Sequence, residues 1–279
     1  MGPCTYDLLL HSPEAPASQP QIRGLLVIFE RGDSGVLYEN ESLRKLAFSQ
    51  QFAIVWAHEC DARSTGDLQA DASKGPGRTL MAAIAQLAHD SGHSELTEAS
   101  LILYGFSAAG VLTATMENDY PEHLAGAIMY AAGSAYTDLD DVTVNVSAAR
   151  IPTLILANAM DVDSGTYRSL AYFGRGRSLS ASWEYGVQKT AGHCCNISTL
   201  PIIVPWVQAV GGGVGSVNVP NSTFVCTPNG ISDSQGRINC NITYAMLGPA
   251  QAASADTGWV PSIAAGDAWL AWVTNPGTN

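Results

Sequence analysis

Residues 101–110 read Leu-Ile-Leu-Tyr-Gly-Phe-Ser-Ala-Ala-Gly, and this stretch decides the fold. An aliphatic run suited to a buried strand ends at Gly105, and a helix-compatible run, Val111 to Met116, follows shortly after. A serine on so tight a strand-to-helix turn is pushed out of the sheet, and the N–H groups at the start of the helix favour negative charge beside it. The stretch therefore predicts that Ser107 is placed to attack a carbonyl group. A compact turn without chemistry is the alternative interpretation.

Apolar runs alternate with helix-like segments on both sides of this turn. Continuous apolar runs are typical of strands that are covered on both faces. We expect strands at residues 5–11, 23–30, 52–58, 101–106, 123–133, 152–157 and 182–187. We expect helices at residues 40–50, 79–89, 111–118, 166–173 and 199–210. This order predicts an α/β domain with a mostly parallel sheet and helices on both faces, in which ligands bind at the carboxyl ends of the strands.

The alternation stops after residue 213, so we divide the chain into an α/β domain, residues 1–213, and a C-terminal extension, residues 214–279, packed on the same domain. Residues 217–243 are rich in Asn, Ser, Thr and Gly and predict a loop or hairpin. A helix-like run, Ile263 to Val273, lies near the end. Trp269 and Trp272 share one face of that helix because they are three residues apart. We favour core packing for this face over a carbohydrate- or polymer-binding surface.

Charge and hydropathy exclude two classes of partner. The chain has 25 acidic and 13 basic residues and a net charge of −12, which argues against binding to nucleic acid or to an anionic membrane surface. No apolar run approaches the roughly 18 to 20 residues that a membrane span needs. The hydrophobic content of 46% is ample for a core.

Cysteines and glycosylation sequences favour a secreted protein with disulfide bonds and N-linked glycans. The six cysteines form no zinc-type Cys-x-x-Cys pair: Cys4, Cys60, Cys194, Cys195, Cys226 and Cys240. The Asn-x-Ser/Thr acceptors are Asn40, Asn145, Asn196, Asn221 and Asn241. The N-terminal Met-Gly-Pro-Cys lacks the basic and apolar regions of a signal peptide. We expect that a signal peptide has been removed, with an intracellular location as the alternative.

Three residues at the carboxyl ends of expected strands follow one another in the order Ser107, Asp161, His193. A serine hydroxyl becomes a good nucleophile when a histidine accepts its proton, and a carboxylate holds that imidazole in the correct tautomer. Asp163 is the alternative carboxylate. The other histidines fit the role of base less well: His11, His58, His89, His93 and His123. His58 ends a strand and, with Phe106, is a candidate for lining the pocket.

From Thr5 to Val210 the chain resembles the α/β-hydrolase superfamily, in particular its secreted serine esterases, lipases, feruloyl esterases and polyester depolymerases. The resemblance rests on the turn at residues 105–110, on the strand and carboxylate at residues 152–161, and on Gly192-His193. The order Ser, Asp, His is the order of the family. The resemblance implies an α/β-hydrolase fold, a Ser107–His193–Asp161 triad, and no cofactor and no metal.

The resemblance also implies an oxyanion hole that combines the N–H of Ala108 with a donor after the second strand. Relatives usually have His-Gly there, whereas this chain has Glu-Arg-Gly-Asp at residues 30–33, so the candidates are Arg31, Gly32 and Asp33. Some feruloyl esterases and tannases join the residue after the histidine to a cysteine before the serine, and Phe106 makes that bond impossible here. Cys226–Cys240 and Cys4–Cys60 are the simplest pairings, and a Cys194–Cys195 bond or bonds from these two to the extension are alternatives.

These inferences together predict a secreted serine hydrolase that cleaves carboxylic esters through an acyl-enzyme. The connection between His123 and Pro152 is too short for a large lid, which favours short-acyl, aryl or polymeric esters as substrates. A peptidase or amidase of the same fold is one alternative. The other is a non-catalytic relative that binds a ligand or polymer through the aromatic residues of the extension.

Overall fold

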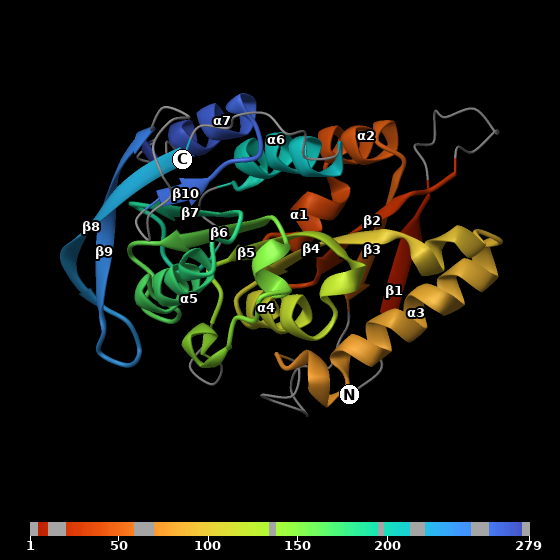
Figure 1. Ribbon diagram of the computed structural model, residues 1–279, viewed down its shortest axis with the longest axis horizontal. Helices are drawn as coiled ribbons and strands as arrows, with labels where there is room; N and C mark the ends of the chain where they lie inside the picture. The colour runs from red at the N-terminus through yellow and green to blue at the C-terminus, as the bar shows by residue number, and fades with distance from the viewer. Residues whose placement is uncertain are drawn as a thin grey trace.

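A seven-stranded sheet forms the centre of the molecule (Figure 1). The computed structural model describes residues 5–10, 21–58, 70–133, 138–194, 198–212, 221–246 and 257–274. The strands run β1 (Thr5–Leu9), β2 (Gly24–Phe29), β3 (Phe52–His58), β4 (Ser100–Phe106), β5 (Leu124–Tyr130), β6 (Thr153–Asn158) and β7 (Trp183–Gln188). They lie in the order β1-β3-β2-β4-β5-β6-β7, with β1 antiparallel to β3 and all other pairs parallel.

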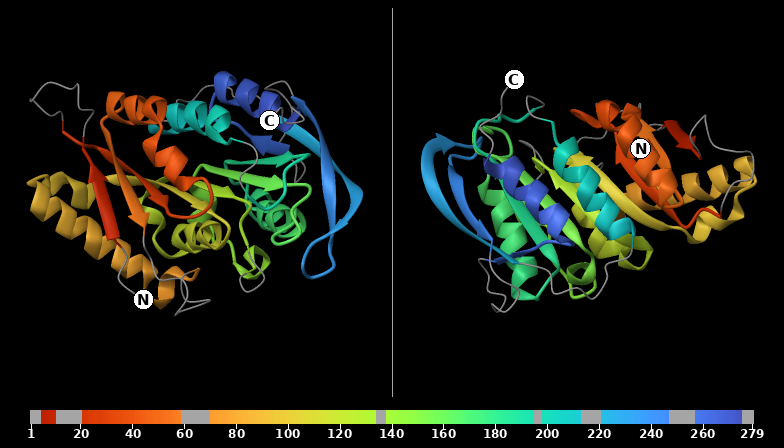
Figure 2. Two further views of the ribbon diagram at one scale, coloured as in Figure 1. Left: turned by 180° about the vertical axis from the view of Figure 1, so that it is seen from behind. Right: turned by 90° about the horizontal axis from the view of Figure 1, so that it is seen from above.

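Helices cover both faces of this sheet (Figures 1 and 2). One face carries α1 (Ser34–Glu39), α2 (Glu41–Ser49), α6 (Leu200–Gly211) and α7 (Ile263–Thr274). The opposite face carries α3 (Pro76–Ser91), α4 (Ala108–Asp119) and α5 (Tyr167–Ser178). In β2, Leu26 and Ile28 pack toward the first face while Leu25 and Val27 pack toward the second. This burial on both sides is why the strands have continuous apolar sequences.

The extension forms a second sheet and a helix at the β7 edge of the molecule (Figure 1). Its strands are β8 (Asn221–Ser232), β9 (Ile238–Met246) and β10 (Thr257–Trp259), in the antiparallel order β10-β8-β9. The hairpin and the final helix match the expectation for the described part, whereas the division at residue 213 stays a prediction. Trp269 and Trp272 are buried in the core beside α6 and β7, so they form no exposed binding face.

The two largest differences between the helices and the sequence expectation lie at α1 and at the end of α5. Helical structure begins at Ser34, because α1 precedes α2, whereas the sequence predicted a helix only from residue 40. Helix α5 continues to Ser178, beyond the expected end at residue 173. Its Gly176 lies so close to the Trp183 ring that an added Cβ would be 2.2 Å from it, so a tertiary contact overrides the low helix propensity of glycine. Within the described ranges no helix is both long and apolar enough to span a membrane.

Candidate active site

Ser107 occupies a strained turn between β4 and α4. Its φ of 56° and ψ of −127° lie in a region that side-chain-bearing residues rarely adopt. The turn is fixed by the Ser107 amide, which donates to the Tyr130 carbonyl oxygen (3.0 Å), and by the Gly133 amide, which donates to the Ser107 carbonyl oxygen (3.1 Å). These bonds hold the serine side chain at the carboxyl edge of the sheet.

The small residues around Ser107 allow strand and helix to approach closely. A Cβ on Gly105 would lie 2.1 Å from the Ala109 carbonyl oxygen, and one on Gly110 would lie 2.7 Å from the Ala132 Cβ. Ala109 itself is half-buried and is accommodated. Residues 105 and 110 are therefore the two positions of this turn that require glycine.

The side chains of Ser107, His193 and Asp161 form one hydrogen-bonded row. The Ser107 Oγ lies 3.0 Å from His193 Nε2, and His193 Nδ1 lies 2.9 Å from Asp161 Oδ2. Asp161 is fully buried, Ser107 is 4% exposed, and the His193 side chain is 21% exposed. The row therefore leads from a fully buried carboxylate, through a partly exposed imidazole, to a nearly buried serine.

Asp161 lies in the acid loop, which we define as residues 159–166 between β6 and α5. Its Oδ1 accepts hydrogen bonds from the amides of Asp163 (2.8 Å) and Ser164 (2.9 Å). Two backbone donors on one oxygen leave Oδ2 to His193, so the carboxylate is fixed in one orientation. The Asp163 side chain is exposed, and no hydrogen bond joins it to the histidine among the described contacts. Of the two predicted carboxylates, Asp161 is the one that faces the base.

Ser164 is a site residue that sequence reasoning missed. Its Oγ is buried 2.7 Å from the Gly133 carbonyl oxygen and 2.9 Å from that of Ala131. The Ser107 hydroxyl lies 3.1 Å from the same Gly133 oxygen, and Ser164 Oγ lies 3.4 Å from His193 Nδ1. Ser164 therefore borders both the serine and the histidine of the row.

His193 packs against Phe106, and its loop is held by β6. The two rings are 5.1 Å apart, and Phe106 also contacts Tyr130, with 5.3 Å between ring centroids. Asn158 Nδ2 donates to the Gly192 carbonyl oxygen (2.7 Å) and to the Tyr130 hydroxyl (3.1 Å). Burial raises the pKa of Tyr130 to about 12, so the hydroxyl that accepts from Asn158 stays neutral. Phe106 therefore contacts the histidine, and its role in lining a pocket stays a prediction.

The structure does not bring His58 to this cluster. His58 ends β3, two strands away from β4 in the sheet order. Its Nε2 lies 3.1 Å from Asp7 Oδ2, and its ring stacks on Trp56 at 4.3 Å. The expectation that His58 lines the pocket therefore finds no contact in the described residues, and His11 lies outside them.

The loop between β2 and α1 carries the three candidates for the second predicted oxyanion donor. The Arg31 amide donates to Ser34 Oγ (3.0 Å), so this candidate is already engaged. The Asp33 amide donates to the residue's own carboxylate, whereas among the described contacts nothing accepts a hydrogen bond from the Gly32 amide. Gly32 has a φ of 58°, and a Cβ there would lie 2.6 Å from the Phe106 ring. The loop therefore requires glycine at this position, directly against the nucleophile turn.

The Asp33 side chain joins the loop between β2 and α1 to strand β4 and to the start of helix α6. Its carboxylate accepts hydrogen bonds from the Tyr104 hydroxyl (2.6 Å) and from Thr199 Oγ1 (3.1 Å). Burial raises the pKa of Asp33 above its ordinary value, while both hydrogen bonds oppose the shift. Asp33 therefore connects the β2–α1 loop to β4 and to the start of α6, which follows the histidine.

The described side chains include two of the six cysteines and three of the five predicted glycosylation acceptors. Cys194 and Cys240 are disulfide-bonded, whereas Cys4, Cys60, Cys195 and the Cys226 side chain lie outside the described part, so every pairing stays a prediction. Asn40 Oδ1 caps α2 by accepting from the Leu43 amide (3.0 Å). Asn145 and Asn241 are exposed, and Asn196 and the Asn221 side chain lie outside the described part.

One group of side chains has the spacing of metal ligands among the described residues. It consists of Asp161, Asp163 and His193, whose ligand atoms lie within 4.8 Å of one another. The hydrogen bond between Asp161 and His193 already uses two of these atoms. The group therefore coincides with the serine row rather than forming a separate centre.

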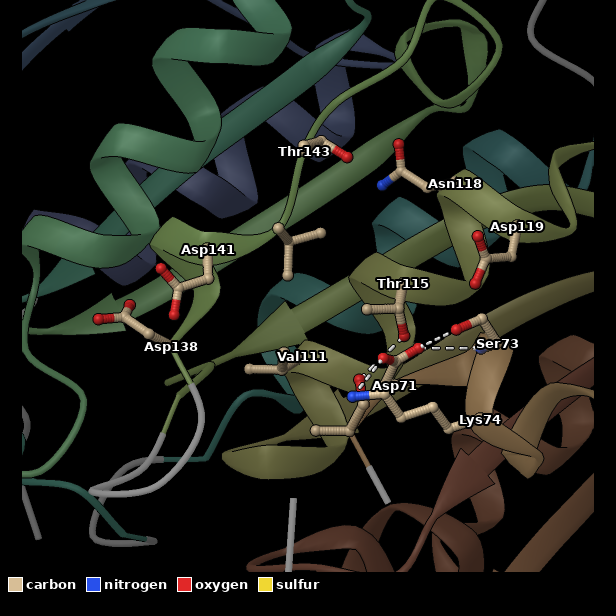
Figure 3. Close-up of a pocket in the computed structure, with 12 residues that line it drawn as sticks. Asp71, Ser73, Lys74, Val111, Thr115, Asn118, Asp119, Asp138, Asp141 and Thr143 are labelled. Atoms are coloured by element: carbon tan, nitrogen blue, oxygen red, sulfur yellow. Dashed lines mark hydrogen bonds and ion pairs between the residues drawn. The ribbon is translucent and has the colours of Figure 1, made fainter. Parts of the chain in front are cut away.

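A hollow of about 420 Å³ lies along α4 (Figure 3). Val111 and Thr115 line its floor, one and two turns after the serine, and the carboxylates of Asp71, Asp119 and Asp141 surround it. The hollow contains none of the three residues of the hydrogen-bonded row. It is thus a separate, acidic depression on the α4 side of the molecule.

Comparisons with known proteins identify the fold. No protein-family model and no curated protein matches the chain. Esterase PE8 is 16% identical, with 74% of this chain and 99% of that chain covered and a TM-score of 0.53. A thermostable esterase is 15% identical over 65% of this chain, with a TM-score of 0.48, and the chain spans about half of its length. A monoacylglycerol lipase from Paleococcus ferrophilus is 12% identical, with 75% and 99% covered and a TM-score of 0.48.

The protein has the α/β-hydrolase fold. Its sheet order, its single antiparallel strand β1 and its serine turn after β4 agree with the similarity to esterase PE8. The resemblance that the sequence indicated is therefore confirmed at the level of the fold.

Proposed function

We propose that this protein is a serine hydrolase that cleaves carboxylic esters through an acyl-enzyme. The observation that carries the proposal is the row of hydrogen bonds from Ser107 Oγ to His193 Nε2 (3.0 Å) and from His193 Nδ1 to Asp161 Oδ2 (2.9 Å). The names of similar structures, which include esterases and a lipase, support the same class of reaction. Short-acyl, aryl or polymeric esters are the proposed substrates.

In the proposed mechanism His193 Nε2 accepts the proton of the Ser107 hydroxyl while Oγ attacks the ester carbonyl carbon. The imidazolium that forms is stabilised by the Asp161 carboxylate, which also fixes the tautomer with the proton on Nδ1. The carbonyl oxygen becomes an oxyanion that accepts hydrogen bonds from the Ala108 amide and from the Gly32 amide. His193 then donates its proton to the leaving alcohol, and the acyl group remains on Ser107.

Deacylation repeats these steps with water as the nucleophile. His193 accepts a proton from water, the hydroxide attacks the acyl carbon, and the carboxylic acid leaves as the proton returns to Ser107. The cycle requires only residues of this chain. The proposal also includes secretion, N-linked glycans and disulfides that staple the extension, and it rests there on the six cysteines and the five acceptor sequences.

A fluorophosphonate probe tests the proposal. We expect it to add one label to the wild type, as measured by intact mass, and none to Ser107→Ala. We also expect p-nitrophenyl acetate to be hydrolysed by the wild type, with kcat at least about 10⁴-fold lower in Ser107→Ala. Cleavage of a p-nitroanilide but not of the ester would favour the amidase alternative, and absence of labelling in the wild type would favour a non-catalytic binding protein.

A further inference from the structure

The hairpin of the C-terminal extension is in direct contact with the acid loop. Asn229 Nδ2 donates to the Ala159 carbonyl oxygen (2.8 Å), and Ser234 Oγ donates to that of Asp163 (3.0 Å). These contacts join residues that are about 70 positions apart in the chain. The loop that carries the carboxylate is therefore supported from outside the α/β domain.

Asn239 makes the most central of these contacts. It lies on β9 and is fully buried. Its Nδ2 donates to the carbonyl oxygen of Asp161 itself (2.7 Å), and its Oδ1 accepts from the Thr166 amide (2.9 Å). One amide side chain thus uses its donor on Asp161 and its acceptor on the last residue of the loop.

The backbone around Asn239 is shaped for this contact. Gly165 has a φ of 66°, and a Cβ there would lie 2.7 Å from Asn239 Oδ1. Next to it, the Cys240 amide donates to Thr166 Oγ1 (2.9 Å). The loop therefore closes around the Asn239 side chain, and a residue larger than glycine at position 165 would separate them.

Ion pairs anchor the same hairpin. Arg237 Nε lies 3.0 Å from Asp233 Oδ2, and Arg237 Nη2 lies 3.1 Å from Asp138 Oδ2. The buried Arg168 on α5 lies 3.3 Å from the same Asp138 oxygen. These ion pairs therefore fix the backbone at position 239 relative to α5, which keeps the Asn239 amide in place beside the acid loop.

We propose that Asn239 is a positioning residue, which acts through Asp161 on the base His193. This inference rests on the proposed function. Asp161 Oδ1 is held by the amides of residues 163 and 164, and these amides follow the peptide whose oxygen Asn239 holds. Without the Nδ2 donor this peptide turns more freely, the two amides lose their alignment, and Oδ2 no longer faces His193 Nδ1 in one orientation. The extension would then be part of the active site.

The test compares Asn239→Ala and Asn239→Asp with Asn241→Ala, in protein produced without glycans. Asn241 lies two residues further along β9 with an exposed side chain, so it is a matched control. Aspartate keeps the size of the side chain and the acceptor for Thr166 but loses the donor to Asp161. Unfolding curves first establish a temperature at which each protein is folded.

For folded Asn239 variants we expect kcat on p-nitrophenyl acetate to fall about 10- to 100-fold, with KM within about twofold, because the reacting groups are misaligned rather than absent. Asn241→Ala should match the wild type. The downfield proton resonance of His193 Nδ1–H, assigned by its loss in His193→Ala, should be present in the wild type and Asn241→Ala and absent or broadened in both Asn239 variants.

Measuring both kcat and the His193 Nδ1–H resonance distinguishes a failure of this inference from a failure of the proposed function. If either folded Asn239 variant keeps the wild-type kcat and the Nδ1–H resonance, Asn239 has only a structural role and the inference is wrong. If the wild type hydrolyses no ester, the proposed function is wrong, and the resonance alone still decides whether Asn239 aligns Asp161 with His193.

Discussion

Two carboxylates that are two residues apart, Asp161 and Asp163, have opposite environments. Asp161 is fully buried and accepts from two amides and from His193, whereas the Asp163 side chain is exposed. A carboxylate that selects the tautomer of a catalytic histidine contributes about 10⁴-fold to kcat in serine hydrolases.

We therefore expect Asp161→Asn to lower kcat on p-nitrophenyl acetate by about 10³- to 10⁴-fold, because the amide stabilises the wrong tautomer of His193. Asp163→Asn serves as its control and should remain within about twofold of the wild type. Steady-state kinetics of the two purified variants check this. Equal losses in both, or a larger loss in Asp163→Asn, would contradict the assignment.

The residues of the row were predictable from the sequence because each lies in the loop that follows a strand of the same sheet. Ser107, Asp161 and His193 come after β4, β6 and β7, whose carboxyl ends share one edge. Asn239 has no such signal, since its contact with Asp161 joins positions 78 residues apart. Its role depends on how the hairpin docks, and no local pattern determines that.

At the scale of elements, α7 supports the loop that carries His193. Gln188 at the end of β7 donates from Nε2 to the Trp272 carbonyl oxygen (2.9 Å), and Trp272 Nε1 donates to that of Ser198 (3.1 Å). Trp269 Nε1 donates to the Tyr185 carbonyl oxygen (3.0 Å) within β7. The i, i+3 spacing of the tryptophans predicted a shared face, but only the docked helix shows that both indoles hold the segments on either side of the base.

We expect Trp272→Phe to lower the free energy of unfolding by about 1 to 3 kcal/mol, because the Ser198 carbonyl oxygen loses its donor while the aromatic packing is largely kept. Urea unfolding followed by circular dichroism measures the change. Exposed Leu179→Ala, on the opposite face of the molecule, is the comparison and should change the stability by less than about 0.5 kcal/mol. A Trp272→Phe protein as stable as the wild type would show that α7 contributes no support through this bond.

At the scale of the whole molecule, the carboxyl group of Glu117 lies in the core between α4, α5 and β6. Glu117 is fully buried, and the Tyr172 hydroxyl donates to its Oε2 (3.0 Å). Its Oε1 contacts Thr153 Oγ1, which lies 3.0 Å from the Ile151 carbonyl oxygen. A protonated Glu117 can donate to Thr153 while Thr153 donates to Ile151, so the neutral acid satisfies this network. Burial raises the pKa of Glu117 to about 8, although both hydroxyl contacts oppose the shift.

This pKa makes the stability of the fold depend on pH. Between the ordinary value of 4.5 and about 8, Glu117 is protonated in the folded chain and ionised in the unfolded chain, so unfolding releases a proton. The contribution of Glu117 to stability is therefore fully present below about pH 4.5 and decreases as the pH rises, by up to about 1.4 kcal/mol per pH unit, until about pH 8.

We expect Glu117→Gln to remove this dependence, so that the free energy of unfolding of the wild type minus that of the variant decreases steadily between about pH 4.5 and about pH 8. Urea unfolding at pH 5, 6, 7 and 8 measures that difference, in which the titration of all other groups cancels. Exposed Glu98→Gln should give a difference that does not vary with pH, and a flat difference for Glu117→Gln would mean that this carboxyl is ionised in the folded core.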